Sequence, residues 1–299
     1  MPHPRPERVL PELSGGAPGS LADVAGIRVG HVTDAVGRTG VTAVLPPAGA
    51  VASGEVRGGA PGTREFELLA PERMVEHVDA VILAGGSAFG LAACDGAMRW
   101  CEERGLGVST PAGRVPIVVG AVIFDLAEGD AAARPDAAAG YAACAAAAPG
   151  PVATGAVGAG TGATVGHVHG AVRPGGVGSA SVAEGDLVVG ALIVVNAFGD
   201  LHDRDRSLGE ARWPETFGPS TNTTIGVLAT NARLDKTGCL LLAQSGHGGL
   251  ARAIEPSHTQ VDGDALVALS CGDLDAPVEQ VRALGARAVH DAIVGVLAC

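Results

Sequence analysis

The sequence predicts a layered protein of the α/β or α+β class. Strand-like apolar runs alternate with helical segments along most of the 299 residues, and such alternation places helices on the faces of sheets. Glycine is abundant, at 46 residues, whereas aromatic residues make up only 3% of the chain. Because small residues let backbones approach closely, we expect a core of aliphatic side chains in tightly contacting layers.

The first predicted elements are two short strands, at 27–32 and 41–45, which a glycine-containing turn separates. A β-branched apolar run at 78–84 predicts a third strand. Helical periodicity follows over 87–104, and Ser87 is a suitable N-cap for this helix. These elements predict a strand, tight turn and helix unit.

The alternation continues to the C-terminus. We predict a strand-like segment at 115–126 and an alanine-rich helix at 135–147. A glycine-rich stretch with short strand pieces follows at 152–181, and a strongly apolar strand at 186–195. The polar stretch 201–221 fits an exposed loop, and a loop of about 20 residues in a compact domain is usually functional or cleavable. We then predict a strand at 223–230 and a helix at 235–254, followed by a strand at 265–269 and a closing helix at 278–298.

The charge balance argues against a nucleic-acid partner. The net charge is −12 and the pI is near 5.1, whereas a phosphate backbone is bound by clustered lysine and arginine. Lys236 is the only lysine in the sequence. The longest charge-free apolar run, 80–94, is interrupted by glycines and is too short to span a bilayer. We therefore expect no membrane partner either.

The cysteines and the N-terminus indicate a cytoplasmic protein. Six cysteines are scattered without a C-x-x-C pair, as is typical of reduced thiols in the cytosol. Residues 1–20 carry charges and prolines but no apolar signal segment. We expect a flexible tail over 1–20 and a single domain over 21–299.

Three local patterns are better explained by structure than by chemistry. The segment 158–163 satisfies a loose G-x-G-x-x-A dinucleotide fingerprint, but glycines and a proline follow it instead of an amphipathic helix. His167 and His169 would share one face of a strand, yet no third metal ligand is indicated by local spacing. Ser245 and His247 lie two residues apart on a predicted helix, where they do not face each other.

The stretch PSTNTTIGVLATNARL at 219–234 allows three interpretations. Asn222 to Thr224 can be an ordinary strand start, since threonine suits strands. The segment can also be a glycosylation acceptor, which requires a secreted chain. In the third interpretation it contains a nucleophile that cleavage of the chain exposes. If the chain is cut before Thr223, the new α-amine has a reference pKa of about 7.7 to 8.0 and can serve as the base for the hydroxyl of the same residue. Spacing alone leaves all three open.

Several separated motifs stand in the sequence in the order DVAGIRVGHVTD, RGGAPGTRE, LAGGSAFGL, VPIVVGAVIFDL, NTTIGVLATNARL and HTQVDGD. Together they resemble the P1/DmpA-type peptidases, the S58 family of self-cleaving N-terminal-nucleophile hydrolases. The Asn-Thr junction and the HTxxDGD segment most resemble the 6-aminohexanoate-oligomer hydrolase branch, whereas relatives with a Gly-Ser junction are aminopeptidases for D-amino-acid or β-amino-acid N-termini. The resemblance implies a four-layer αββα sandwich of α+β class and assembly as tetramers or larger. It also implies self-cleavage between Asn222 and Thr223 into an α chain, 1–222, and a β chain, 223–299.

The resemblance assigns roles to individual residues. Thr223 matches the family nucleophile, and Asn196 matches the asparagine whose side-chain amide helps to form the oxyanion hole. Asp262 and Asp264 match the acidic pair that orients the nucleophile and its amine. Without the resemblance, a turn before the following strand would be the favoured interpretation of this Asp-Gly-Asp segment. No metal or organic cofactor is implied.

Two positions depart from the family pattern. His167 stands in GATVGH where relatives often carry lysine, so a group that titrates near pH 6.5 replaces a permanent cation. Phe124 stands where some relatives have tyrosine, so a hydroxyl near the predicted substrate pocket is lost. We expect these departures to alter the pH dependence and either the rate or the substrate range.

The sequence thus predicts a self-processing N-terminal-threonine amidohydrolase. Its expected substrate is a short peptide or a linear oligoamide with a free amine, and its expected state is a homo-oligomer. Two other classes stay open. One is an acyltransferase of the related ornithine-acetyltransferase fold, which passes the acyl group to an amine. The other is an uncleaved, inactive homologue, which the departures at His167 and Phe124 make conceivable.

Overall fold

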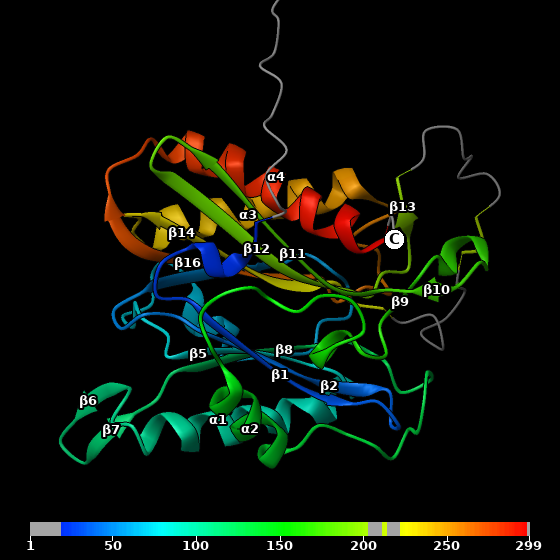
Figure 1. Ribbon diagram of the computed structural model, residues 1–299, viewed down its shortest axis with the longest axis horizontal. Coiled ribbons are helices and arrows are strands. Elements are labelled where there is room, and N and C mark those ends of the chain that lie inside the picture. Colours follow the sequence, from blue (N-terminus) through cyan, green and yellow to red (C-terminus); the bar gives the residue numbers. More distant parts are fainter. Residues whose placement is uncertain (1–18, 203–210, 214–221, 298–299) are drawn as a thin grey trace, which may run out of the picture.

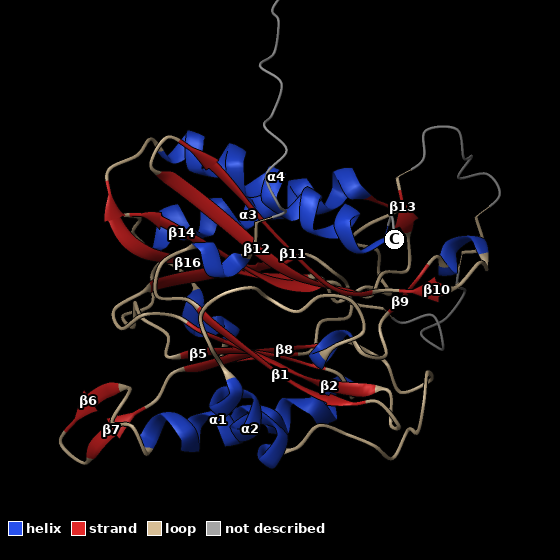
Figure 2. Cartoon of the chain, viewed as in Figure 1, coloured by secondary structure: helices blue, strands red, loops and turns tan. Residues whose placement is uncertain are grey.

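The computed structural model describes residues 19–202, 211–213 and 222–297. Two five-stranded sheets pack face to face, and two helices cover the outer face of each sheet (Figure 1). Figure 2 shows the four layers by secondary structure, with strands between two helical layers. The predicted four-layer αββα sandwich is confirmed.

The first sheet has the strand order β1-β2-β5-β8-β4. Its neighbouring strands are antiparallel except for β5 and β8, which run parallel and are connected through helix α1. Helix α2 packs beside α1 on the same outer face. The bounds are β1 Arg28–Asp34, β2 Thr39–Leu45, β4 Thr63–Arg64, β5 Ala80–Ala84, α1 Ala93–Glu102, β8 Val118–Val122 and α2 Ala137–Ala146.

The second sheet repeats this plan with the order β11-β12-β14-β16-β3. Its one parallel pair is β14 and β16, which helix α3 connects, and α4 packs against α3 on the outer face. The bounds are β3 Val51–Val56, β11 Gly176–Glu184, β12 Leu187–Val195, β14 Ile225–Ala232, α3 Lys236–Ala253, β16 Ala265–Leu274 and α4 Val278–Leu297.

Short elements connect the layers. Three two-strand ladders are formed by β6 Val108–Thr110 with β7 Gly113–Val115, by β9 Thr164–Val165 with β10 Arg173–Pro174, and by β13 Asp200–Leu201 with β15 Ile254–Glu255. The 3-10 helices are η1 Leu21–Asp23, η2 Phe66–Leu69, η3 Ser87–Ala92, η4 Gly158–Gly160 and η5 His167–His169.

Alternation along the strands separates the core into layers. In β14, the side chains of Ile225, Val227 and Ala229 enter the core between the two sheets, whereas Leu228 packs toward α3 and α4. Successive strand residues point to opposite faces, so one uninterrupted apolar run fills two separate cores. This explains why the apolar residues of β14 form a continuous run in the sequence rather than alternating with polar residues.

Three local expectations were wrong. Ser87 is not an N-cap, because it lies inside η3 with φ +53 and makes no capping hydrogen bond, and α1 begins only at Ala93. His167 and His169 lie in the 3-10 helix η5 and not on a strand. The strand predicted from Thr223 begins at Ile225, because other contacts hold the two threonines.

Two predicted segments fall largely outside the described residues. Of the tail predicted over 1–20, only Gly19 and Ser20 are described, and the Ser20 backbone N–H donates to Asp23 at the start of η1. Of the loop predicted over 201–221, residues 203–210 and 214–221 are not described.

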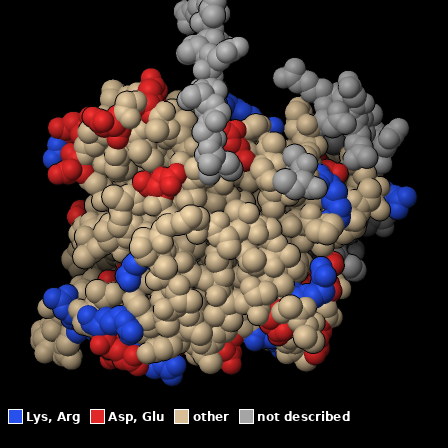
Figure 3. Space-filling view, viewed as in Figure 1, with Lys and Arg blue, Asp and Glu red and all other residues tan. Residues whose placement is uncertain are grey.

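The helices and the charged side chains at the surface are relevant to membrane and nucleic-acid binding. Across the described ranges, no helix is long and apolar enough to cross a bilayer. On the face drawn in Figure 3, lysine, arginine and acidic side chains lie toward the edges and the middle carries neither sign of charge.

Glycines allow the helices of each outer layer to touch through their backbones. A Cβ at Gly249 of α3 would lie 2.1 Å from the carbonyl oxygen of Ala286 in α4. Gly96 and Gly140 make the same kind of approach between α1 and α2. The sparse aromatic content is thus matched by close helix contact, as the composition predicted.

Adjacent glycines of α3 provide a matched test of this packing. We expect Gly249→Ala to destabilise the fold by about 1 to 3 kcal/mol, because the methyl group would overlap the α4 backbone. Gly248→Ala meets open space and should stabilise the helix by up to about 1 kcal/mol through helix propensity. Urea unfolding midpoints measure both, and equal effects of the two substitutions would contradict the close packing of α3 on α4.

Candidate active site

The site forms where the parallel strands β14 and β16 begin. Ile225 pairs with Ala265 at the start of this register, so the residues that precede the two strands lie side by side. Asn222 forms an isolated parallel bridge with Asp262. Although 40 positions separate them in the chain, the segments 222–224 and 262–264 are therefore brought into direct contact.

The peptide bond between Asn222 and Thr223 is held by specific hydrogen bonds. The Asn222 N–H donates to the carbonyl oxygen of Val261 at 3.0 Å, and the Asn222 carbonyl oxygen accepts the Gly263 N–H at 3.0 Å. The Thr223 hydroxyl donates to this same carbonyl oxygen at 2.5 Å. A nucleophilic group and a polarising donor thus lie at the same carbonyl group.

The backbone N–H groups on the other side of this bond are also bound. The Thr223 N–H donates to the Asn196 carbonyl oxygen at 2.6 Å, and the Thr224 N–H donates to Asp264 Oδ1 at 2.8 Å. Thr223 is only 3% exposed. The first two residues after the bond are therefore fixed before the strand begins.

Asn196 follows strand β12 and is fully buried. Its Oδ1 accepts the Thr164 N–H at 2.9 Å, and its Nδ2 donates to the Phe124 carbonyl oxygen at 3.2 Å. An amide nitrogen carries two N–H groups, so one donor remains besides the bond to Phe124. The rotamer of Asn196 is thus set by bonds at both ends of the amide.

The two predicted aspartates are buried and close to each other. Asp262 accepts the N–H groups of Phe198 and Thr259, at 3.1 and 3.0 Å, and the Thr259 hydroxyl. Burial, and then the nearby charge of Asp264, raise the pKa of Asp262 to about 6. Its ionisation is therefore shifted toward the neutral pH range.

Asp264 divides its two oxygens between different partners. While Oδ1 binds Thr224, Oδ2 accepts both the backbone N–H and the ring Nδ1 of His258, at 3.1 and 2.7 Å. The ring of His247 lies edge-on to that of His258, with centroids 4.9 Å apart. A buried histidine pair therefore stands behind Asp264.

His167 contacts Thr164, which in turn holds Asn196. Its Nε2 lies 3.0 Å from Thr164 Oγ1, and burial lowers the pKa of its imidazole below 6.5, so the neutral form prevails at pH 7. No hydrogen bond joins it to Thr223 within the described part of the chain. Its connection to Asn196 runs through Thr164, whose backbone N–H donates to the Asn196 amide oxygen.

Lys236 is engaged elsewhere. It begins helix α3 and donates from Nζ to three backbone carbonyl oxygens, at 2.9 to 3.2 Å. They belong to Leu68, Arg73 and Val75. The single lysine therefore fixes the segment around η2 rather than the site.

Two motifs of the predicted family meet at the site. The loop 57–65, RGGAPGTRE, runs along 259–264, with the Ala60 N–H donating to the Asp262 carbonyl oxygen at 2.8 Å. A Cβ at Gly58 would lie 2.2 Å from that oxygen, and one at Gly59 would lie 2.6 Å from Gln260. The paired glycines of this motif are thus required by close backbone approach.

Thr223 lies on the wall of a cavity of about 330 Å³, a volume within the range of small-molecule sites. Phe124 is on the same wall. The other lining residues come from the loop 57–65, η3, the end of β8 and the turn before Asp262: Gly59, Ala60, Pro61, Gly62, Ser87, Ala88, Val122, Ile123 and Gln260.

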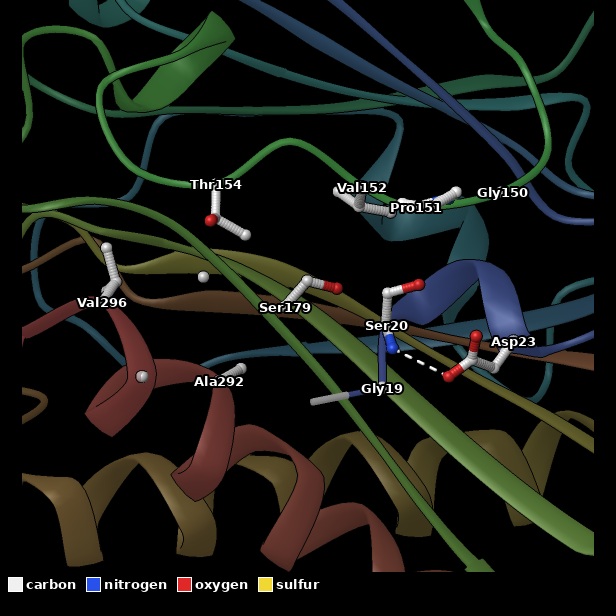
Figure 4. A pocket seen from close by; sticks show the side chains of 12 residues that line it. Gly19, Ser20, Asp23, Gly150, Pro151, Val152, Thr154, Ser179, Ala292 and Val296 are labelled. Carbon is white, nitrogen blue, oxygen red and sulfur yellow. Dashed lines mark hydrogen bonds between the residues drawn. The ribbon is translucent and has the colours of Figure 1, made fainter. Parts of the chain in front are cut away.

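A second cavity, of about 370 Å³, lies among η1, β11 and α4 (Figure 4). Asp23 is the sole ionisable side chain among the described residues that line it, and it binds the Ser20 N–H and the Ser181 hydroxyl. The Ser179 hydroxyl is occupied by the Leu21 N–H and the Ala191 carbonyl. The Asp23 carboxylate and the Ser179 hydroxyl of this cavity are thus engaged in hydrogen bonds within the fold.

Other reactive groups are less suited to catalysis. Burial raises the pKa of the Cys239 and Cys271 thiols to about 12, so neither is a thiolate at neutral pH. Over the described ranges, no group of three or more histidine, cysteine, aspartate or glutamate side chains is arranged to hold a metal. Neither these thiols nor a metal centre within the described ranges therefore offers an alternative to a hydroxyl group at this site.

Comparison with known proteins identifies the family. The profile of peptidase family S58 matches residues 19–298. The chain belongs to peptidase family S58. This S58 peptidase is an amide-bond hydrolase.

Its relatives include proteins named as aminopeptidases and as 6-aminohexanoate-oligomer endohydrolases. A protein of Mycobacterium leprae (strain TN), named an uncharacterized aminopeptidase, is 45% identical over 294 residues, covering 86% of this chain and 80% of the relative. The 6-aminohexanoate-oligomer endohydrolase of Kocuria sp. (strain KY2) is 32% identical over 312 residues, covering 97% and 85%.

Solved structures agree with the fold of this S58 peptidase. A Burkholderia sp. beta-aminopeptidase superimposes with a TM-score of 0.72 at 27% identity, covering 95% of this chain and 88% of the other. The L-aminopeptidase D-Ala-esterase/amidase of Ochrobactrum anthropi, described as a variant of the Ntn hydrolase fold, has a TM-score of 0.73 at 22% identity and covers 94% and 87%.

The structure of this S58 peptidase brings together most of the predicted residues and adds two that were not predicted. The Thr223 N–H binds the Asn196 carbonyl oxygen, and Asp264 binds the N–H of the next residue, Thr224. The additions are Gly263, through its N–H, and His258. Both belong to the HTQVDGD motif, so the motif was a signal for them, but their contacts depend on the pairing of β14 with β16.

Gly263 has room for hydrogen only. A Cβ there would lie 2.8 Å from Thr223 Oγ1 and 2.5 Å from the Ala60 carbonyl oxygen. We expect Gly263→Ala to lower amide hydrolysis by roughly tenfold or more, since displacements of the order of an ångström are costly at a reacting group. Rates on an amide panel measure this, with Gly248→Ala as the control. Wild-type activity in a folded Gly263→Ala variant would contradict the crowding at Thr223.

Proposed function

We propose that this S58 peptidase is a self-processing hydrolase whose nucleophile is Thr223, exposed as the N-terminus of a β chain, 223–299. The hydrolase unit covers 21–299, and the α chain ends at Asn222. The observation that carries the proposal is the 2.5 Å hydrogen bond from the Thr223 hydroxyl to the Asn222 carbonyl oxygen, because it holds the nucleophile against the bond to be cut.

Self-cleavage is an acyl shift from nitrogen to oxygen. Thr223 Oγ1 attacks the Asn222 carbonyl carbon, and its proton passes to the Thr223 nitrogen as the carbon–nitrogen bond breaks. The Gly263 N–H, already 3.0 Å from the carbonyl oxygen, stabilises the negative charge that develops there. Water then hydrolyses the ester, which frees the Asn222 carboxylate and the Thr223 hydroxyl.

Substrate hydrolysis reuses the same hydroxyl with a new base. The freed Thr223 amine, with a reference pKa of about 7.7 to 8.0, accepts the hydroxyl proton. The alkoxide attacks the substrate carbonyl carbon, and the unused N–H of the Asn196 amide stabilises the oxyanion. The carbon–nitrogen bond of the substrate then breaks, and the amine leaves with the proton that the Thr223 amine had accepted, so that an ester on Thr223 remains. The acyl group is released from Thr223 by water. Asp262 and Asp264 keep the amine and the chain end in place, and His167 supports Asn196 through Thr164.

The substrate class follows from the relatives. Amides of short peptides or linear oligoamides are proposed, because relatives are named for aminopeptidase and 6-aminohexanoate-oligomer hydrolase activity. The cavity beside Thr223 accepts an aliphatic acyl group against Phe124 and Val122. We also propose a homo-oligomer of αβ units. A cytoplasmic location is proposed because all five described cysteines are free thiols, which suits a reducing compartment.

Thr223→Ala should stay a single chain and lose hydrolysis, because the variant lacks the attacking oxygen. The wild type should yield pieces of roughly 22 and 8 kDa, scaled from the residue counts, with threonine at the new N-terminus. Intact mass and N-terminal sequencing measure both.

Thr224→Val is the matched control for this prediction. The Thr224 hydroxyl is buried and has no hydrogen-bond partner within the described part of the chain, so its replacement by a methyl group of similar size should leave processing intact. Amide hydrolysis by Thr223→Ala, or an uncut wild type after long incubation, would place the nucleophile elsewhere.

Processing should slow as the pH falls below about 6. The raised pKa of Asp262 means that its carboxylate takes up a proton in this range, and the protonated group loses an acceptor for the turn that carries the Gly263 N–H. We expect a decline of about tenfold per pH unit, as for one essential ionisation. Intact-mass time courses on fresh precursor measure it before any Thr223 amine exists.

Asp262→Asn provides the control for this pH dependence. The neutral amide should make processing slow at every pH, like the wild type at low pH, while circular dichroism shows a folded protein. A processing rate of the wild type that stays constant from pH 5 to 8 would exclude Asp262 as the controlling group.

A further inference from the structure

His258 has a backbone conformation that a non-glycine residue rarely adopts. Its φ of +56 lies in the left-handed region, where histidine, asparagine and aspartate are tolerated better than most residues. The ring is largely buried, with 16% of the side chain exposed. Such strained conformations persist where the surrounding contacts determine them and are concentrated at functional sites.

The strained backbone directs two donors of His258 to one oxygen. Asp264 Oδ2 accepts the His258 N–H at 3.1 Å and Nδ1 at 2.7 Å. Because a carboxylate only accepts, the ring proton lies on Nδ1. Asp264 is 2% exposed and has Asp262 as a neighbour of like charge, so these donors compensate for the loss of water around a buried carboxylate.

The ring of His258 is itself held from behind. His247 of α3 is fully buried and lies edge-on to it, with centroids 4.9 Å apart. His247 Nε2 lies 3.1 Å from the Glu55 carbonyl oxygen in β3, so this ring is fixed to the sheet edge. A chain of contacts thus leads from β3 through His247 and His258 to Asp264.

We propose that His258 is a positioning residue. It holds the Asp264 carboxylate in the orientation in which Oδ1 accepts the Thr224 N–H. This inference rests on the proposed function. In the intact chain, Asn222 is also bound to Val261 and Gly263, which anchors Thr223 from the preceding side. Cleavage removes that covalent anchor, so the new chain end depends on the bonds of Thr223 to Asn196 and of Thr224 to Asp264.

This dependence predicts a larger effect on hydrolysis than on self-cleavage. A displaced chain end moves the hydroxyl and its amine relative to a bound acyl group, and this lowers kcat. The cavity that binds the acyl group is lined by neither His258 nor Asp264, so KM should change little. A purely structural role would instead reduce the amount of folded protein and leave kcat per folded molecule unchanged.

The test uses two substitutions of His258 in the full chain. His258→Gly removes the ring and fits a positive φ without strain. His258→Asn also tolerates this φ and places an amide N–H where Nδ1 was, so it keeps the hydrogen bond. Each variant is followed for processing by intact mass and for steady-state hydrolysis of the linear 6-aminohexanoate trimer and β-alanyl p-nitroanilide.

We expect His258→Gly to process but to lose roughly 10- to 100-fold in kcat with little change in KM, as for a misplaced reacting group. His258→Asn should recover most of that loss. His290→Ala is the matched control, because His290 also faces an aspartate, at 3.0 Å from Asp291, but on the exposed side of α4. It should match the wild type in processing and in kcat.

A folded His258→Gly variant with wild-type kcat would overturn the proposal, and so would a His258→Asn variant as slow as His258→Gly. If His258→Gly does not fold, the kcat of His258→Asn is compared with that of His290→Ala. Both should be near the wild-type kcat, because His258→Asn keeps the hydrogen bond to Asp264 and His290→Ala does not affect it. These outcomes are distinct from failure of the proposed function, which appears in the wild type as an uncut chain or in Thr223→Ala as residual hydrolysis.

Discussion

The parallel pairing of β14 with β16 is the constraint on which the site depends. Parallel strands begin at the same edge of a sheet, and the register Ile225 to Ala265 therefore sets 222–224 beside 262–264. The crossover helix α3 supplies the connection that such a pair requires. This register places the backbone groups of Val261 and Gly263 against Asn222, whereas the Thr223 N–H is held by Asn196, which follows β12.

Burial gives the polar groups at this edge their chemical character. Asn196, Thr223, Asp262 and Asp264 are at most 3% exposed, and an unpaired polar group is costly at such burial. Their hydrogen bonds are thus obligatory as well as orienting. The same burial raises the pKa of Asp262 and lowers that of His167, so one environment brings a carboxyl group into the neutral range and keeps an imidazole uncharged.

The sequence-based predictions succeeded where local periodicity decides and were wrong where tertiary contacts decide. The helices and the buried strands β5, β12 and β14 were found because continuous apolar runs and helical periodicity are local signals. Strand β3 was not predicted, because VASGEV mixes glycine and a serine with apolar residues and becomes a strand through its pairing with β16. Ser87 was misassigned because its positive φ is imposed by the turn after β5.

The sequence by itself determined the layered class, the acidic character and, through several ordered motifs, the family to which Thr223, Asn196 and the two aspartates could be matched. Only the tertiary structure decided which donors reach the Asn222 carbonyl group, that Lys236 serves another segment and that His258 stands behind Asp264. The reason is physical. Motifs record residue types along the chain, whereas hydrogen bonds and pKa shifts arise from neighbours that the register of β14 and β16 brings together from distant positions.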